Sequence, residues 1–164
     1  MDEDFLNEFR QTIESAEKKL LAISEAQSEI RLAPEKWSAR ELLGHLIDSA
    51  GNNHHRFVLA QLSEDLVFPS YDQDKWVEVQ KYQQASWPLL VQLWKAYNLH
   101  LLHVMTVTPD ETLRKRRSKH NLYEIAWRPV EKRVPISLKY LMRDYLYHLQ
   151  HHLNQIFALS AAHS

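Results

Sequence analysis

Two histidines near the C-terminal end, His148 and His152, lie four residues apart in a segment whose apolar residues recur at helical spacing. On an α-helix this spacing places two imidazoles on one face, one turn apart. Such a pair can bind one divalent metal ion, as the helical His-x-x-x-His pair of zinc proteases does. The Glu that follows the first histidine in that motif is Leu149 here. A pair is not a complete site, so a third ligand has to come from another element.

Three further histidines lie in the segment from Ser38 to Leu62, which also has helical periodicity. His45 has apolar neighbours that place it near the core-facing side, whereas His54 and His55 lie in a more polar stretch. We therefore predict His45 as the third ligand. Three neutral imidazoles leave coordination positions open on a divalent ion, so that water can bind there and be activated. From spacing alone, core or surface histidines that never meet are an equally good interpretation.

Four polar residues are candidates for supporting roles in such a site. Asp48 lies one turn from His45 and is placed to accept the second ring proton of that histidine, or to form an interhelical salt bridge. Gln155 lies one turn beyond the second clamp histidine, where it would orient a ligand ring or end the bundle as an ordinary polar residue. Asn52 and Arg56 continue the His45 face and are candidates to bind a polar or anionic substrate, with plain solvation as the alternative.

Other polar and aromatic residues have weaker patterns. Tyr71, Asp72 and Trp76 could form a lid over a cavity, although a loop that packs its own aromatic side chains is the preferred interpretation. The basic run from Arg114 to Lys119 could attract an anionic ligand, but a solvated loop is the more usual outcome. His151 points about 100° away from its neighbour and is expected at the surface. Four histidines without a partner pattern are expected to be structural or exposed: His100, His103, His120 and His163.

The candidate residues are positioned by segments with helical periodicity. This periodicity predicts four long helices, at about Asp4 to Ser24, Ser38 to Leu62, Ser86 to Thr106 and Ser137 to Ala162. The second begins with a capping box, Ser38-Ala39-Arg40-Glu41. A loop followed by a short helix is predicted around Phe68 to Trp76, and the segment from Thr108 to Pro135 is expected to be irregular. An all-α four-helix bundle, as one domain over residues 1–164, is the economical fold.

Composition excludes several classes of protein. With 2 Gly and 6 Pro in 164 residues, the chain has few residues for the turns of a many-stranded fold. A net charge of -1 argues against a nucleic-acid partner. The absence of cysteine excludes disulfides, thiolate metal sites and a cysteine nucleophile, and is compatible with the cytoplasm. The N-terminus is acidic and has no signal pattern, and no apolar run is long enough to cross a membrane.

Two motifs resemble the signatures of a known family. Trp37-Ser38-x-x-Glu41-x-x-x-His45-Leu46-x-Asp48 resembles the helix-two signature of the DinB superfamily, and His148-x-x-x-His152-x-x-Gln155 resembles its helix-four signature. The middle of the chain is similar to the YfiT-like branch, which is matched in order by Asn53, Arg56-Phe57, Leu59-Ala60 and Pro69-x-Tyr71-Asp72-x-Asp74-x-Trp76. The resemblance covers about Arg31 to Ile156 and is weak between Thr108 and Ser137.

The resemblance implies both a fold and an activity. It implies a bundle of up-down-down-up topology and a divalent metal, typically nickel or zinc, held by His45, His148 and His152. Some YfiT-like members carry another His where this chain has Gln155. The implied activity is that of a metal-dependent hydrolase that activates water toward a small-molecule substrate. Two alternatives stay open, a thiol S-transferase that uses a low-molecular-weight thiol such as bacillithiol, and a non-catalytic, stress-related metal-binding protein. A homodimer is an option by family analogy.

Overall fold

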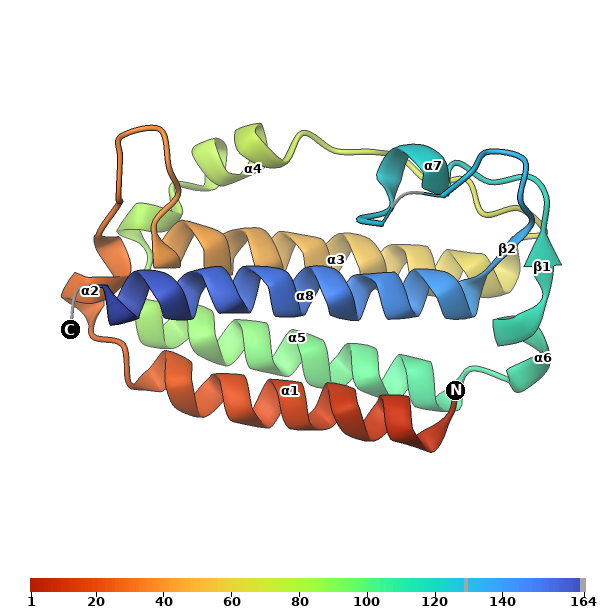
Figure 1. Ribbon diagram of the computed structural model, residues 1–164, viewed down its shortest axis with the longest axis horizontal. Coiled ribbons are helices and arrows are strands. Elements are labelled where there is room, and N and C mark those ends of the chain that lie inside the picture. Colours follow the sequence, from red (N-terminus) through yellow and green to blue (C-terminus); the bar gives the residue numbers. More distant parts are fainter. Residues whose placement is uncertain (129, 163–164) are drawn as a thin grey trace.

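Four long helices make up most of residues 1–128 and 130–162, the part of the chain that this computed structural model describes (Figure 1). His163, expected to be structural or exposed, lies outside these residues. The long helices are α1 (Glu3–Leu21), α3 (Ala39–Leu62), α5 (Trp87–Val107) and α8 (Leu138–Ala161). Each begins and ends within a few residues of the predicted bounds, so the all-α bundle is confirmed.

The directions of the helices follow from Figure 1. α1 and α8 run one way along the bundle, and α3 and α5 run the opposite way. α3 packs against α5 and α8, and α1 packs against the same two helices. The predicted up-down-down-up topology is therefore confirmed. Because α3 and α5 are parallel, the chain between them has to return along the whole length of the bundle.

Side-chain caps fix where the long helices begin. The Asp2 carboxylate accepts the backbone N–H of Phe5 and so caps α1. At α3, the Ser38 hydroxyl accepts the N–H of Glu41 at 3.2 Å, and the Glu41 carboxylate accepts the N–H of Ser38 at 3.0 Å. This reciprocal pair is the predicted capping box. It fixes the start of α3, and therefore also the helical position of His45.

The buried apolar residues of the four helices form one contiguous core. Phe9 of α1 and Phe57 of α3 each contact the ring of Tyr145 on α8, edge to face, with ring centroids 6.0 Å apart. The Tyr145 hydroxyl donates to Oδ1 of Asn98 on α5 at 2.6 Å, so its polar end is satisfied inside the core. This one residue therefore joins all four helices beneath the face that carries His148.

The connections contain more regular structure than the periodicity predicted. Instead of continuing to Ser24, α1 ends at Leu21, because Ser24 and Gln27 form a capping box for a new helix. The segment between Thr108 and Pro135 was expected to be irregular, but it contains two short helices and a strand that pairs with residues 136–137. The short elements are α2 (Glu25–Glu29), α4 (Gln73–Gln80), the 3-10 helix η1 (Tyr82–Gln84), α6 (Asp110–Arg114), β1 (Arg116–Arg117), α7 (Leu122–Ile125) and β2 (Ile136–Ser137).

The basic run from Arg114 to Lys119 is exposed to solvent, as expected, except at Arg117. Arg117 is buried and donates from Nη2 to the carbonyl of Ala60, in the last turn of α3, at 2.9 Å. Lys115 and Lys119 form ion pairs with Glu64 and Asp65, which follow α3. These contacts hold the second long connection against the end of α3. Arg114, Lys115 and Lys119 are paired with carboxylates and Arg116 donates to the Pro135 carbonyl, so the run offers few unpaired charges to an anionic ligand.

Two connections lie together over one face of the bundle. Residues 63–86 and 115–128, which we call the roof, pass over the side formed by α3 and α8 (Figure 1), and α4, η1 and α7 are the helical parts of the roof. They are joined where Leu66 pairs with His120, and where the Asn121 side chain accepts the N–H of Phe68 at 3.0 Å. No helix among the described residues combines the length and apolar character needed to cross a membrane.

Candidate metal centre

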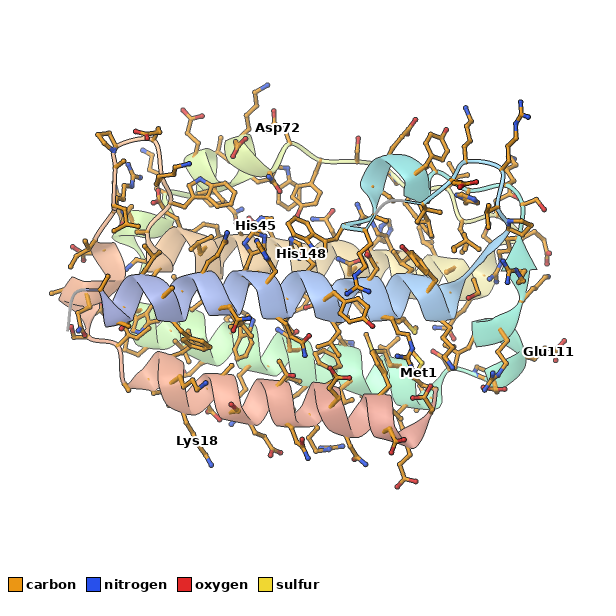
Figure 2. All side chains as sticks on the ribbon, in the orientation of Figure 1. Met1, Lys18, His45, Asp72, Glu111 and His148 are labelled. Carbon is orange, nitrogen blue, oxygen red and sulfur yellow. The ribbon has the colours of Figure 1, made fainter. Side chains whose placement is uncertain are left out.

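Three imidazoles meet on the face of the bundle that the roof covers. His45 comes from α3, and His148 and His152 come from successive turns of α8. One ring nitrogen from each lies within 4.8 Å of the others. Nε2 of His45 and Nε2 of His148 are 3.2 Å apart, and Figure 2 shows these two rings side by side above α8. The three predicted ligands are thus brought together by the antiparallel pairing of α3 and α8.

The spacing and orientation of the rings fit a bound metal ion. Two nitrogens at about 2.0–2.1 Å from a tetrahedral zinc ion lie about 3.3 Å apart, close to the 3.2 Å between His45 and His148. Nδ1 of His148 faces the Ser49 hydroxyl at 3.4 Å, and Nδ1 of His152 faces Oε1 of Gln155 at 2.7 Å. These contacts leave Nε2 of both α8 histidines free for a metal. An outer partner of this kind fixes ring orientation and tautomer.

Burial keeps the three imidazoles uncharged at neutral pH. It lowers the pKa of His45 to about 4, with a smaller contribution from nearby His152. It also lowers the pKa of His148, which His152 and His45 lower further. For His152, burial again lowers the pKa, against the opposing effect of the Gln155 hydrogen bond. Neutral imidazoles offer a lone pair, so the cluster can bind a divalent cation without first releasing protons.

Asp48 does not accept a proton from His45, and that prediction is wrong. Its Oδ1 accepts hydrogen bonds from the Tyr82 hydroxyl at 2.7 Å and from Nε2 of Gln80 at 2.8 Å. Both donors lie in the roof, near the end of the connection between α3 and α5. Nδ1 of His45 is buried, and no partner for it is found among the described residues. Asp48 therefore attaches the roof to α3 and, among the described residues, forms no hydrogen bond with His45.

Asn52 is likewise not part of the cavity at the histidine cluster. Its side chain donates back to the carbonyl of Asp48 at 2.9 Å, and it lines a separate cavity of 420 Å³ with Trp76 and Tyr97. The next residue, Asn53, lines the cavity at the cluster. One helical position turns a side chain by about 100°, and the cavity lies toward α8, on the side to which Asn53 points. The substrate role predicted for Asn52 therefore lacks support from its position.

Arg56 does line a cavity beside the cluster, as a substrate-binding residue would. This cavity of 230 Å³ is bordered by His45 and His148 at one end and by Arg56, Tyr71 and Asp144 farther along. The Arg56 side chain is 7% exposed, and within the described residues its one hydrogen bond runs from Nη2 to the Pro69 carbonyl at 3.4 Å. A guanidinium has five N–H donors, so most of them have no partner.

Trp127 covers the three-histidine cluster, a role that no sequence pattern indicated. Its ring centroid lies 5.2 Å from that of His148 and 5.7 Å from that of His152. The Asp144 carboxylate holds this part of the roof, because it accepts the backbone N–H of Trp127 at 2.7 Å and that of Arg128 at 2.8 Å. Asp144 lies four residues before His148 on α8, and that spacing was a usable signal that the sequence interpretation missed.

The predicted lid residues divide between two roles. Tyr71 lines the cavity, and its ring contacts that of Trp76 at a centroid distance of 4.9 Å. Asp72 caps α4 by accepting the N–H of Lys75, and in Figure 2 it lies apart from the labelled imidazoles. The loop therefore packs its own aromatic rings, as preferred, and places one of them at the cavity.

Two other histidines, His100 and His151, lie outside the three-histidine cluster. His100, expected to be structural or exposed, is exposed, and its Nε2 lies 3.2 Å from Nε2 of His54 on the outside of the α3–α5 pair. His151, expected at the surface, is exposed and contacts the Trp127 ring with centroids 4.8 Å apart. Neither contributes a nitrogen to the three-histidine cluster.

Comparison with known proteins assigns this architecture to a family. The model of the DinB superfamily matches residues 8–156, and the chain belongs to that superfamily. YfiT from Bacillus subtilis (strain 168) is 28% identical over 124 residues, which are 76% of this chain and 64% of YfiT. The match thus spans less than two thirds of that relative.

A solved structure of YfiT from Bacillus subtilis gives the same fold. YfiT is described there as a probable metal-dependent hydrolase with an unusual four-helix bundle topology. Its TM-score with this chain is 0.76 at 19% sequence identity, and the match covers 99% of this chain and 89% of that one. The prediction of the YfiT-like branch is confirmed.

Proposed function

We propose that this protein is a metal-dependent hydrolase whose divalent ion, nickel or zinc, is held by His45, His148 and His152. The convergence of three neutral imidazole nitrogens at the end of a cavity carries the proposal. The similarity to YfiT, a probable metal-dependent hydrolase, supports it. When bound, the ion would act as a Lewis acid that lowers the pKa of water and polarises the bond to be broken. Three protein ligands leave positions open for this chemistry.

The side chains around the cavity prepare it for a small anionic substrate. Arg56 is buried, and its unpaired N–H groups match a carboxylate or phosphate, which accept two parallel hydrogen bonds. Burial lowers the pKa of the Arg56 guanidinium, and nearby Tyr71 and Asp144 offset part of this effect, so the charge can accept a further partner. An anionic group on the substrate would supply that partner. The rings of Trp127 and Tyr71 also line this cavity.

The first test is metal content after purification without a histidine tag. For His45→Ala we expect the affinity for zinc to fall by at least about 100-fold, since loss of even an outer partner costs about 10- to 100-fold. His151→Ala is the matched control, because it removes an exposed imidazole next to His152 and should leave the affinity unchanged. Equal zinc binding by both variants would show that the ligand assignment is wrong.

The second test separates the two kinds of nucleophile. The chain has no cysteine, so a thiol mechanism requires a thiol cosubstrate. Metal-loaded protein is incubated with a panel of small anionic esters and amides, with and without a low-molecular-weight thiol. Turnover without thiol, reduced in Arg56→Met more for anionic than for neutral substrates, is the expected result. Strict dependence on the thiol would indicate an S-transferase, and metal binding without turnover would indicate a non-catalytic protein.

A further inference from the structure

A second and larger cavity meets the histidine cluster from the other side. This groove of 670 Å³ is bordered by His152 and Gln155, whereas the cavity of 230 Å³ is bordered by His45 and His148. Gln73, at the start of α4, lines both. The three imidazoles therefore lie at the boundary between two spaces, one on each side of the position where a metal ion would be bound.

The two spaces differ in chemical character. The smaller cavity is the more polar of the two, and its lining includes the buried Arg56 guanidinium and the carboxylates of Glu124 and Asp144. Carbon predominates in the groove, and its lining includes Leu32, Trp37, Leu42 and Ala158. Leu32 is 63% exposed, so a large apolar side chain lies at the surface with little protein over it. Burial of such a surface by a ligand is favourable because it removes apolar area from water.

The apolar lining continues up to the cluster itself. The Trp37 indole lies against the His45 imidazole, with ring centroids 5.2 Å apart. On α8, Ala158 and Gln155 follow His152 along the same groove. A molecule bound at the histidines thus has an apolar path on one side and a cationic group on the other. A volume of 670 Å³ lies within the range of small-molecule sites, so a medium-length hydrocarbon chain fits it.

We infer that the substrate is an acyl derivative of a small anionic compound. Its apolar acyl chain occupies the groove, its anionic end binds Arg56, and the bond to be broken lies at the cluster between them. This inference rests on the proposed hydrolase function and names its substrate class. Water adds its oxygen to the acyl carbon, the bond from that carbon to the leaving oxygen or nitrogen breaks, and the leaving atom takes a proton. The products are an apolar carboxylic acid and the small anionic compound.

The test uses hydroxamic acids, which bind zinc through their two oxygens and extend an alkyl chain into the groove. Binding of acetohydroxamate, butanohydroxamate and octanohydroxamate to zinc-loaded protein is measured by calorimetry. A fully buried methylene contributes about fourfold in affinity, and a groove that is open on one side should give about twofold. The expected gain from acetohydroxamate to octanohydroxamate is therefore about 60-fold.

Two variants test whether the alkyl chain of the hydroxamate binds in the groove. Ala158→Glu places a carboxylate in the groove from an exposed helical position, six residues from His152. It should reduce the gain to less than about fivefold, with zinc content and acetohydroxamate affinity unchanged. Asn154→Glu is the matched control, since this exposed residue lies on another side of α8, near Thr12. It should keep the full gain.

Each other outcome has its own meaning. Acetohydroxamate binding without any gain along the series would overturn the groove assignment and leave the metal centre intact. A full gain retained in Ala158→Glu would mean that the alkyl chain binds elsewhere, and this result would also overturn the groove assignment. Failure of every hydroxamate to bind to zinc-loaded protein would refute the open metal site and the substrate class together.

Discussion

Asp144→Asn tests how the roof is held over the histidines. The Asp144 carboxylate is 5% exposed, and its two oxygens accept the N–H groups of Trp127 and Arg128 at 2.7 and 2.8 Å. Asparagine has nearly the same shape but one acceptor oxygen, so its NH₂ group has to face one of the two donors. The variant therefore removes one hydrogen bond and takes the charge from the other, while the volume of the side chain is kept.

The size of the effect follows from these two bonds. A hydrogen bond to a charged acceptor contributes about 1.5–3 kcal/mol, and a neutral one contributes about 0.5–1.5 kcal/mol. Losing one charged bond and weakening the other costs about 3 kcal/mol by this reasoning. Burial raises the pKa of Asp144, so removal of its charge returns part of a desolvation cost. We expect a net loss of about 2 kcal/mol, or about 30-fold in the equilibrium for local opening.

Amide hydrogen exchange measures this opening directly. The amides of Trp127 and Arg128 should exchange about 30-fold faster in Asp144→Asn, whereas the amide of Leu149, in the buried part of α8, should be unaffected. Asp110→Asn is a control for loss of a carboxylate, because Asp110 is exposed and pairs with Arg114 within α6. Exchange at residues 127–128 within threefold of the wild-type rate would refute the reasoning, and other contacts would have to hold the roof.

Three further predictions concern stability. Gly44→Ala should destabilise the protein by about 2 kcal/mol or more, because the new Cβ would lie 2.2 Å from Cδ2 of Tyr82, and urea denaturation measures the loss. Gly51→Ala should be neutral or stabilising by up to about 1 kcal/mol, since the new Cβ would make an ordinary contact 3.5 Å from the Tyr97 hydroxyl. Marked destabilisation of this variant would contradict the packing around Gly51. In the metal-free protein, burial lowers the pKa of His45 to about 4 from 6.5, so stability present above pH 6.5 should be lost as the pH falls toward 4. A urea midpoint that is constant between pH 7.5 and 4.5 would argue against burial of these rings.

Periodicity was sufficient for the bundle because each long helix has its own apolar stripe and start signal. The capping box at Ser38 and Glu41 begins α3 where the sequence predicted it. The apolar neighbours of His45 placed it correctly on the face toward α8, where His148 approaches from the antiparallel helix. Local patterns predict which residues share a face of a helix. Because four helices pack in only a few arrangements, the fold then determines which of those faces meet.

The surroundings of the cluster depend on contacts that no local pattern contains. The partners of Asp48 are Gln80 and Tyr82, near the end of the connection between α3 and α5. Trp127 reaches the histidines because Asp144 binds its backbone and because Arg117 attaches the same connection to α3. Neither segment has a strong periodicity of its own. Helical spacing also could not separate Asn52 from Asn53 as the cavity residue, since a single position decides the side toward which a side chain turns.

The parallel course of α3 and α5 has an evolutionary consequence. α5 has 21 residues and a length of about 31 Å, so the connection from residue 63 to 86 has to cover a comparable distance before α5 begins. The imidazoles belong to the rigid helices, whereas Tyr71, Gln73 and Trp127 belong to the connections. The proposed metal ligands and the roof side of the cavity are therefore encoded in separate stretches of the gene. Exchange of the two connections between homologues would change the roof side of the cavity, while the helical residues, Arg56 and Ala158 among them, are inherited unchanged.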